Sequence, residues 1–222
     1  MKDYDRIAPH TFEHCPLPGN TPRMTMPDTL FDRFKVKFET LKGHVHLVAS
    51  WEEAAEEAGA ICQRAGAGRV AVARAPGPFQ EALEGWCKKN QTDLLRPPFA
   101  SESLPGAIDA AEVGITSMDF AIARTGTLVE VALDDATRLV SSLPRTHIGL
   151  VSARDMVDDL DAAAPRLREI FAEHPRNCVV SFLSGPSRTG DIEMRLTLGV
   201  HGPASAHAIV LAESMDVEMP HG

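Results

Sequence analysis

Residues suited to binding an anion gather in one segment of the sequence, Ser184-Gly-Pro-Ser-Arg-Thr-Gly-Asp191. The segment follows an apolar run that predicts a strand and precedes one that predicts a helix. Free backbone N–H groups, hydroxyls and a guanidinium suit a phosphate or carboxylate, and open α/β sheets bind ligands at the carboxyl ends of their strands. The absence of the P-loop lysine excludes a Walker nucleotide site. The candidate anion-binding residues here are Ser184, Gly185, Ser187, Arg188, Thr189, Asp191 and Glu193.

Each of these residues also has a purely structural interpretation. Ser187 and Thr189 could simply cap the following helix, with Arg188 pairing with a nearby acid. Asp191 and Glu193 could orient a cation or a ligand hydroxyl, or they could form the negative first turn that the helix dipole favours.

A second loop, Arg124-Thr-Gly-Thr127, offers the same donor types between two runs that predict strands. Thr125, Gly126 and Thr127 are therefore candidates for the same anion site. A tight hairpin turn would need only the glycine, so a structural role explains the loop equally well.

Two histidines are candidates for proton transfer. His147 stands at the start of a predicted strand and His201 in a loop before the last one. Histidines in such positions are also common as hydrogen-bonded structural residues. His44 and His46 share one face of a strand, but no third ligand is identifiable, so no metal site is predicted.

Composition excludes several classes of protein. Acidic residues outnumber basic ones, 31 to 22, for a formal net charge of −9, so nucleic acid is not an expected partner. No run of about 18 apolar residues predicts a membrane span, and the first residues carry no apolar signal segment. Four scattered cysteines favour reduced thiols in the cytoplasm and cannot supply an iron–sulfur cluster.

The pattern of elements predicts an α/β fold with a mostly parallel sheet. Residues 1–27 hold Pro9, Pro16, Pro18, Pro22 and Pro27, which predicts an irregular N-terminal arm before a single domain over 28–222. Helices are predicted at 28–43, with Asp28 as the cap, and at 51–65, 79–89 and 155–173. Strands are predicted at 44–49, 69–73, within 113–133 as two or three short pieces, and at 147–153, 177–185 and 207–213, the last closing the sheet.

Eight blocks of the second half of the sequence, in order, resemble the LUD-domain family, with a spacing similar to its lactate utilization protein C branch. The blocks are Gly114-Ile-Thr116, Asp119-Phe-Ala-Ile-Ala123, Thr125-Gly-Thr127, Leu143-Pro144, His147-Ile148, Ser184-Gly-Pro-Ser-Arg-Thr189, Asp191-Ile-Glu193 and Leu198-Gly-Val-His-Gly-Pro203.

The resemblance implies a three-layer α/β/α sandwich, the fold shared by sugar-phosphate isomerases, CoA transferases and formyltetrahydrofolate cyclo-ligase. It also implies a role in oxidising L-lactate to pyruvate, as the cluster-free member beside two iron–sulfur proteins. Where family members usually have Glu-Thr-Gly-Thr, this sequence has Arg124. An arginine cannot replace a glutamate base or nucleophile, so the substitution predicts either lost or altered chemistry or an extra positive charge at an anion site.

Three functions remain open at this point. The first is a cluster-free subunit of a lactate-oxidising system that binds a small carboxylate or a phosphate-bearing ligand, with no cofactor of its own evident and iron–sulfur clusters only on its partners. The second is a stand-alone enzyme of the isomerase, CoA-transferase or cyclo-ligase kind. The third is a scaffold or regulatory protein. Homo-oligomerisation is compatible with each of them.

Overall fold

Six parallel strands form the central sheet of the computed structural model, in the order β1-β12-β7-β4-β2-β3. The structure describes residues 29–99, 104–190, 196–198 and 202–212. The strands of this sheet are β1 (His44–Val48), β2 (Arg69–Val72), β3 (Asp93–Leu95), β4 (Val113–Ser117), β7 (Thr146–Ser152) and β12 (Ser205–Leu211).

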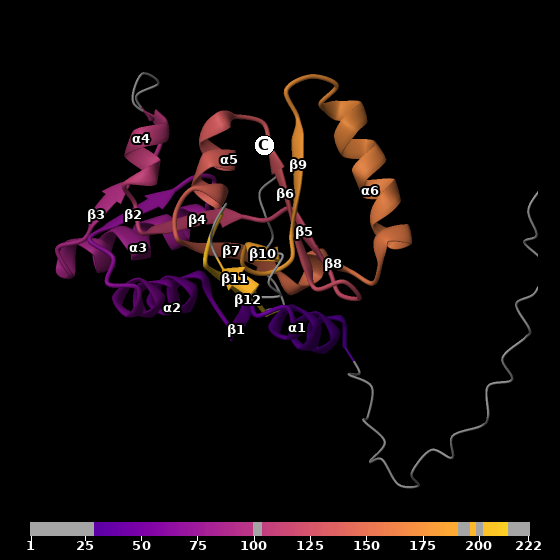
Figure 1. Cartoon of the computed structure of the whole chain (residues 1–222), viewed down its shortest axis with the longest axis horizontal. Coiled ribbons are helices and arrows are strands. Elements are labelled where there is room, and N and C mark those ends of the chain that lie inside the picture. Colours follow the sequence, from indigo (N-terminus) through magenta and orange to yellow (C-terminus); the bar gives the residue numbers. More distant parts are fainter. Residues whose placement is uncertain (1–28, 100–103, 191–195, 199–201, 213–222) are drawn as a thin grey trace, which may run out of the picture.

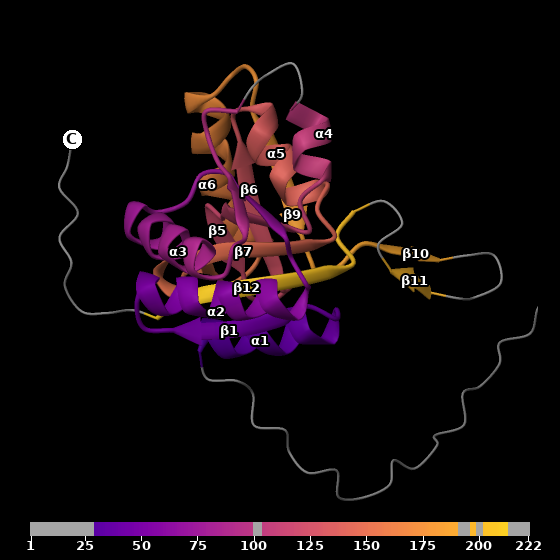
Figure 2. The same ribbon diagram turned by 90° about the vertical axis from the view of Figure 1, so that its left-hand side faces the viewer.

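A smaller four-stranded sheet, in the order β8-β5-β6-β9, packs beside the central one. Its strands are β5 (Phe120–Ile122), β6 (Thr127–Ala132), β8 (Met156–Val157) and β9 (Val179–Leu183). A separate antiparallel pair, β10 (Arg188–Gly190) with β11 (Leu196–Leu198), follows β9 in the chain. Figure 2 shows this pair extending outward beyond the start of β12.

Helices cover both faces of the central sheet, which makes the fold a three-layer α/β/α sandwich (Figure 1). The helices are α1 (Leu30–Thr40), α2 (Trp51–Arg64), α3 (Gly77–Lys89), α4 (Leu104–Asp109), α5 (Asp135–Ser142) and α6 (Leu160–Glu173). On one face α2 and α3 bury a core with Val70, Ile115 and Ile148. On the other face lie α1, α4, α5 and the small sheet, whose own outer surface packs on α6.

Side-chain caps explain where several helices begin. The hydroxyl of Ser50 accepts from the backbone N–H of Glu53 at the start of α2, as its capping-box spacing predicts. Asp134 and Asp159 accept in the same way at the starts of α5 and α6. These caps satisfy N–H groups that have no partner within the helix.

The parallel sheet and most of the predicted elements are confirmed, with three corrections. The segment after the serine-rich loop was expected to enter a helix, but its first residues form strand β10. The last strand was expected to close the sheet, whereas β12 lies inside it, between β1 and β7. The sixth helix begins at Leu160 rather than 155, because a 3-10 turn and β8 come first.

Two further expectations concern the N-terminal residues and the absence of a membrane span. The N-terminal arm and the cap Asp28 lie outside the described residues, and the observed cap of α1 is Thr29. Across the described ranges, no helix combines the length and the apolar character needed to cross a bilayer.

A matched pair of glycine substitutions tests the packing of α5 on the sheet. A Cβ at Gly114 of β4 would collide with the backbone carbonyl of Val140 in α5, and backbone cannot move aside as a flexible side chain can. Gly114→Ala should therefore lower the free energy of unfolding by about 1–3 kcal/mol. Gly85 of α3 has open space around its Cβ position, so Gly85→Ala should raise it by up to about 1 kcal/mol. Urea unfolding measures both; equal effects would contradict this packing.

Candidate functional site

Three hydroxyl groups from the two predicted loops meet in the structure. Strand β6 pairs with β9, with Leu128 opposite Leu183, so the loops next to these residues come together. The Oγ1 atoms of Thr125 and Thr127 are 2.8 Å apart, and Oγ1 of Thr127 is 2.8 Å from Oγ of Ser184. Two hydrogen bonds among three hydroxyls use two of their three protons. This hydroxyl cluster, Thr125, Thr127 and Ser184, therefore retains one O–H to donate to another group.

Glycines let both loops approach the end of α1. Gly126 and Gly185 have φ values of 61° and 92°, which disfavour residues with a Cβ. A Cβ at Gly126 would lie 2.6 Å from the backbone nitrogen of Phe38, and one at Gly185 would lie 2.7 Å from the carbonyl oxygen of Leu41. The glycines are needed here for backbone conformation and close packing, which sets the position of the hydroxyl cluster.

The serine-rich loop reaches the amino end of β12, which corrects the expected position at carboxyl ends of the parallel sheet. The backbone N–H of Ser187 donates to the carbonyl of Pro203, two residues before β12, at 2.8 Å. Gly202 lies against the Ser187 side chain, since a Cβ there would be 3.2 Å from that of Ser187. The loop does follow the carboxyl end of β9, but β9 belongs to the small sheet.

Several other predicted site residues stay predictions. For Arg188 and Thr189 the structure describes the backbone, as part of β10. Asp191, Glu193 and His201 lie outside the described residues. The role of all five in anion binding or proton transfer is thus a matter for experiment.

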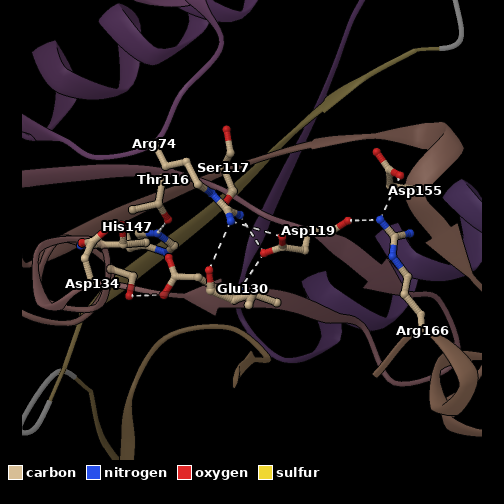
Figure 3. Close-up of polar contacts among 12 residues, drawn as sticks. Arg74, Thr116, Ser117, Asp119, Glu130, Asp134, His147, Asp155 and Arg166 are labelled. Atoms are coloured by element: carbon tan, nitrogen blue, oxygen red, sulfur yellow. Dashed lines mark hydrogen bonds and ion pairs between the residues drawn. The ribbon is translucent and has the colours of Figure 1, made fainter. Parts of the chain in front are cut away.

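His147 of β7 lies in a buried polar network beside Thr116 (Figure 3). Its Nε2 is 2.9 Å from Oγ1 of Thr116 on β4, and its side chain is 2% exposed. Burial lowers the pKa of His147 to about 4, so the ring is neutral at neutral pH. Because the ring is buried, proton transfer by His147 to a ligand stays a prediction.

Glu130 of β6 is a buried carboxyl in the same network. Its Oε2 accepts from the hydroxyl of Ser141 at 2.7 Å, and its Oε1 has no hydrogen-bond partner among the described residues. Burial raises the pKa of Glu130, and the hydrogen bond from Ser141 opposes this rise. The pKa values of Glu130 and His147, on either side of Thr116, are thus shifted in opposite directions, and both shifts favour the neutral form.

An arginine ties the small sheet to the large one (Figure 3). Arg74, after β2, donates to both carboxylate oxygens of Asp119, at 2.6 and 3.2 Å, and to the carbonyls of Ser117 and Val131. Asp119 also accepts from the backbone N–H of Val131 at 2.6 Å. This bidentate pair fixes the β5–β6 hairpin, and with it the loop that carries Thr125 and Thr127.

Arg124, where the resemblance implies a glutamate, lies beside the start of α6. Its side chain is 76% exposed and lies 3.6 Å from a carboxylate oxygen of Asp159, the cap of α6. Its backbone N–H donates to the carbonyl of Asp158. Both contacts hold it against the start of α6.

Sequence reasoning missed Glu130, Ser141 and Arg74 as parts of the polar network. The available signal was the lone glutamate in the apolar run Leu128–Ala132. This run lies in β6, all six residues of which are buried. Ser141 and Arg74 carried no signal, since their contacts depend on how α5 and the small sheet pack in the folded protein.

The fold and these loops together define an α/β/α protein whose polar residues collect at glycine-rich turns. The LUD domain family matches residues 31–211, and the chain belongs to that family. A DUF162 family protein from Deinococcus radiodurans has a similar structure, with a TM-score of 0.53 and 25% identity over 82% of this chain and 96% of that one.

Relatives named lactate utilization protein C match over different lengths. The protein of Anoxybacillus flavithermus is 31% identical over 67% of this chain and 65% of its own length. The protein of Geobacillus kaustophilus is 30% identical over 77% of this chain and 75% of its own length. That of Shouchella clausii is 38% identical over 46% of this chain and 45% of its own length. The chain thus spans about half to three quarters of the length of these relatives.

The pH dependence of stability tests the buried state of Glu130. Because burial raises its pKa in the folded protein, its contribution to stability is present below the unfolded-state pKa and is lost as pH rises through the folded one. The glutamine of Glu130→Gln does not titrate. The free energy of unfolding of this variant should therefore increase relative to that of wild type as pH rises above about 4.3.

Glu84→Gln is the matched control for that series. Hydrogen bonds and charges from Lys88 and Arg96 lower the pKa of Glu84, so its contribution is lost as pH falls and the trend should be weak and of opposite sign. Parallel stability profiles for wild type and Glu130→Gln, from urea titrations at several pH values, would contradict the buried carboxyl.

Proposed function

We propose that this protein is the cluster-free component of a system that oxidises L-lactate to pyruvate together with iron–sulfur partner proteins. The observation that carries the proposal is the family match over residues 31–211, joined with relatives named lactate utilization protein C. In this role it supplies a binding surface for a small anionic ligand, while electron transfer takes place on its partners.

The hydroxyl cluster supports the anion-binding part of the proposal. One O–H of Thr125, Thr127 and Ser184 remains to donate outward. The serine-rich loop brings Ser187 and β10, which contains Arg188, to the same end of the molecule. A carboxylate or phosphate held there would gain hydrogen bonds from hydroxyls and charge-assisted bonds from the guanidinium.

Growth of the source organism tests the role in lactate oxidation. Deletion of the gene should abolish or strongly slow growth on L-lactate as the carbon source and leave growth on pyruvate unchanged, because only the oxidation step is missing. A plasmid with the wild-type gene should restore growth. Equal growth of the deletion strain and its parent on L-lactate would overturn the proposal.

The same strain tests the loops. Ser184→Ala removes one hydroxyl from the cluster and should slow growth on L-lactate by several-fold, because a lost hydrogen bond weakens ligand binding by about 0.5–1.5 kcal/mol. Ser181→Ala, on the neighbouring strand β9, is the matched control and should grow as wild type does. Immunoblots confirm equal amounts of each variant.

A further inference from the structure

A second polar site lies at the amino ends of three parallel strands, on the face that α2 covers. A cavity of about 620 Å³ is bounded there by the first residues of β1, β7 and β12, which are His44, Thr146 and Ser205. Its remaining wall consists of His46, Glu57, Ile61, Arg64, Ala65 and His207. We refer to it as the histidine cavity.

Pairing of β1 with β12 assembles the histidines. His44 lies directly opposite His207 in the register, and their rings stack with centroids 4.7 Å apart. Nε2 of His46 is 3.1 Å from Nδ1 of His207. The sequence showed only the two histidines of β1; the third comes from a strand about 160 residues later, which no spacing rule could indicate.

A chain of hydrogen bonds fixes which nitrogen of each ring carries a proton. Oε1 of Glu57 lies 3.0 Å from Nδ1 of His46. A carboxylate only accepts hydrogen bonds, so Nδ1 of His46 donates and, in a neutral ring, its Nε2 accepts. Nδ1 of His207 must then donate to that Nε2.

The same logic leaves Nε2 of His207 as an acceptor. That atom is 3.0 Å from Oγ of Ser205, whose hydroxyl donates to it. Ser205 lines the cavity, so a ligand hydroxyl that displaces the serine hydroxyl meets a preorganised imidazole lone pair. The carboxylate of Glu57 therefore sets, through His46, the hydrogen-bonding role that His207 presents to the cavity.

The surroundings keep His207 neutral. Burial lowers the pKa of His207 to about 3, and electrostatic interactions with His44, His46, Arg64 and His147 lower it further. Burial also lowers the pKa of His46, although Glu57 opposes it. At neutral pH the acceptor on His207 is thus retained.

Arg64 supplies a positive charge to the same cavity. It lies in the last turn of α2, with its side chain 59% exposed, and one guanidinium nitrogen pairs with Glu57 at 3.1 Å. A guanidinium has five N–H donors, so donors remain for a ligand carboxylate. Ile61 and Ala65, on the same helix, add an apolar wall.

We propose that the histidine cavity binds a small 2-hydroxy carboxylate, with the carboxylate on Arg64, the hydroxyl donating to Nε2 of His207 and the carbon chain against Ile61 and Ala65. The choice of L-lactate as the probe rests on the proposed function. The site is separate from the hydroxyl cluster, which lies on the α1 side of the central sheet.

Titration of the full-length, ¹⁵N-labelled protein with L-lactate, followed by NMR, tests this site. Resonances of Arg64 and His207 should shift in a saturable way. Propionate, which lacks the hydroxyl, should bind several-fold more weakly, because it makes no hydrogen bond to Nε2 of His207, which keeps its bond from Ser205. Arg64→Gln should weaken L-lactate binding about tenfold or more, since it removes a charge-assisted contact.

Two further variants make the test specific. Arg69→Gln, at an exposed arginine of β2 that pairs with Asp93, is the matched control and should bind as wild type does. Ser205→Ala should bind at least as tightly as wild type, because the serine hydroxyl no longer competes for His207. Arg64 is exposed, so its substitution leaves the fold intact, as circular dichroism will show.

Equal affinities of wild type and Arg64→Gln, or no saturable shift at Arg64 and His207, would overturn the proposal. If binding is instead lost in Ser184→Ala, the ligand belongs to the hydroxyl cluster; the cavity proposal then fails while the proposed function stands. If the growth experiment fails but L-lactate binds saturably in the cavity, the cavity proposal stands and the proposed function fails.

Discussion

Insertion of β12 between β1 and β7 is the constraint on which the rest of the structure depends. All seven of its residues pair in parallel with β7, and five of them, from His207 to Leu211, also pair in parallel with β1. Without it, β1 would have no partner in the central sheet, since the order there is β1-β12-β7. The strand also buries Ala208, Ile209 and Val210 fully between the two helical faces, so completing the sheet and forming both cores are one event.

The same strand builds the polar edge of the molecule. The residues just before it bind the serine-rich loop through Pro203 and Ser187. Its own first residues place Ser205 and His207 beside the histidines of β1. Two groups of candidate binding residues, one on each face of the sheet, thus depend on a single long-range pairing. Loss of that pairing would disrupt both groups at once.

The sequence predicted elements whose signals are local. The cap Ser50 and the alanine-rich run after it located α2 within a residue at its C-terminal end, and the β-branched stretch around Gly126 predicted the hairpin of β5 and β6. The sequence also assigned the two candidate loops to the same anion site, and the pairing of β6 with β9 does place Thr127 beside Ser184.

Features that depend on distant partners could not be predicted in this way. The apolar segment that forms β12 has the same composition whether it lies at an edge or in the centre, so its position was missed. The residues after Ser187 resembled a capped helix, yet β10 pairs with β11 instead. Glu130 is the lone charged residue of an otherwise apolar run, and its partner Ser141 of α5 was not indicated by any local pattern.

The LUD fold explains how a chain with few charged groups inside can still present directed hydrogen-bond donors and acceptors. Glycines at positive φ bring backbone and hydroxyls close to α1, while strand pairing aligns imidazoles from opposite ends of the sequence. In both places the polar atoms are oriented by partners within the protein before any ligand arrives. Such preorganisation lowers the entropic cost of binding.

The most direct test of this account is long-range ¹H–¹⁵N NMR of the histidine side chains, which reports the protonated nitrogen of each ring. The account predicts that His207 stays neutral between pH 6 and pH 8 on the basis of its lowered pKa of about 3. It also predicts that the proton resides on Nδ1, with Nε2 free to accept. A His207 ring that carries its proton on Nε2, or that titrates near the ordinary value of about 6.5, would contradict it.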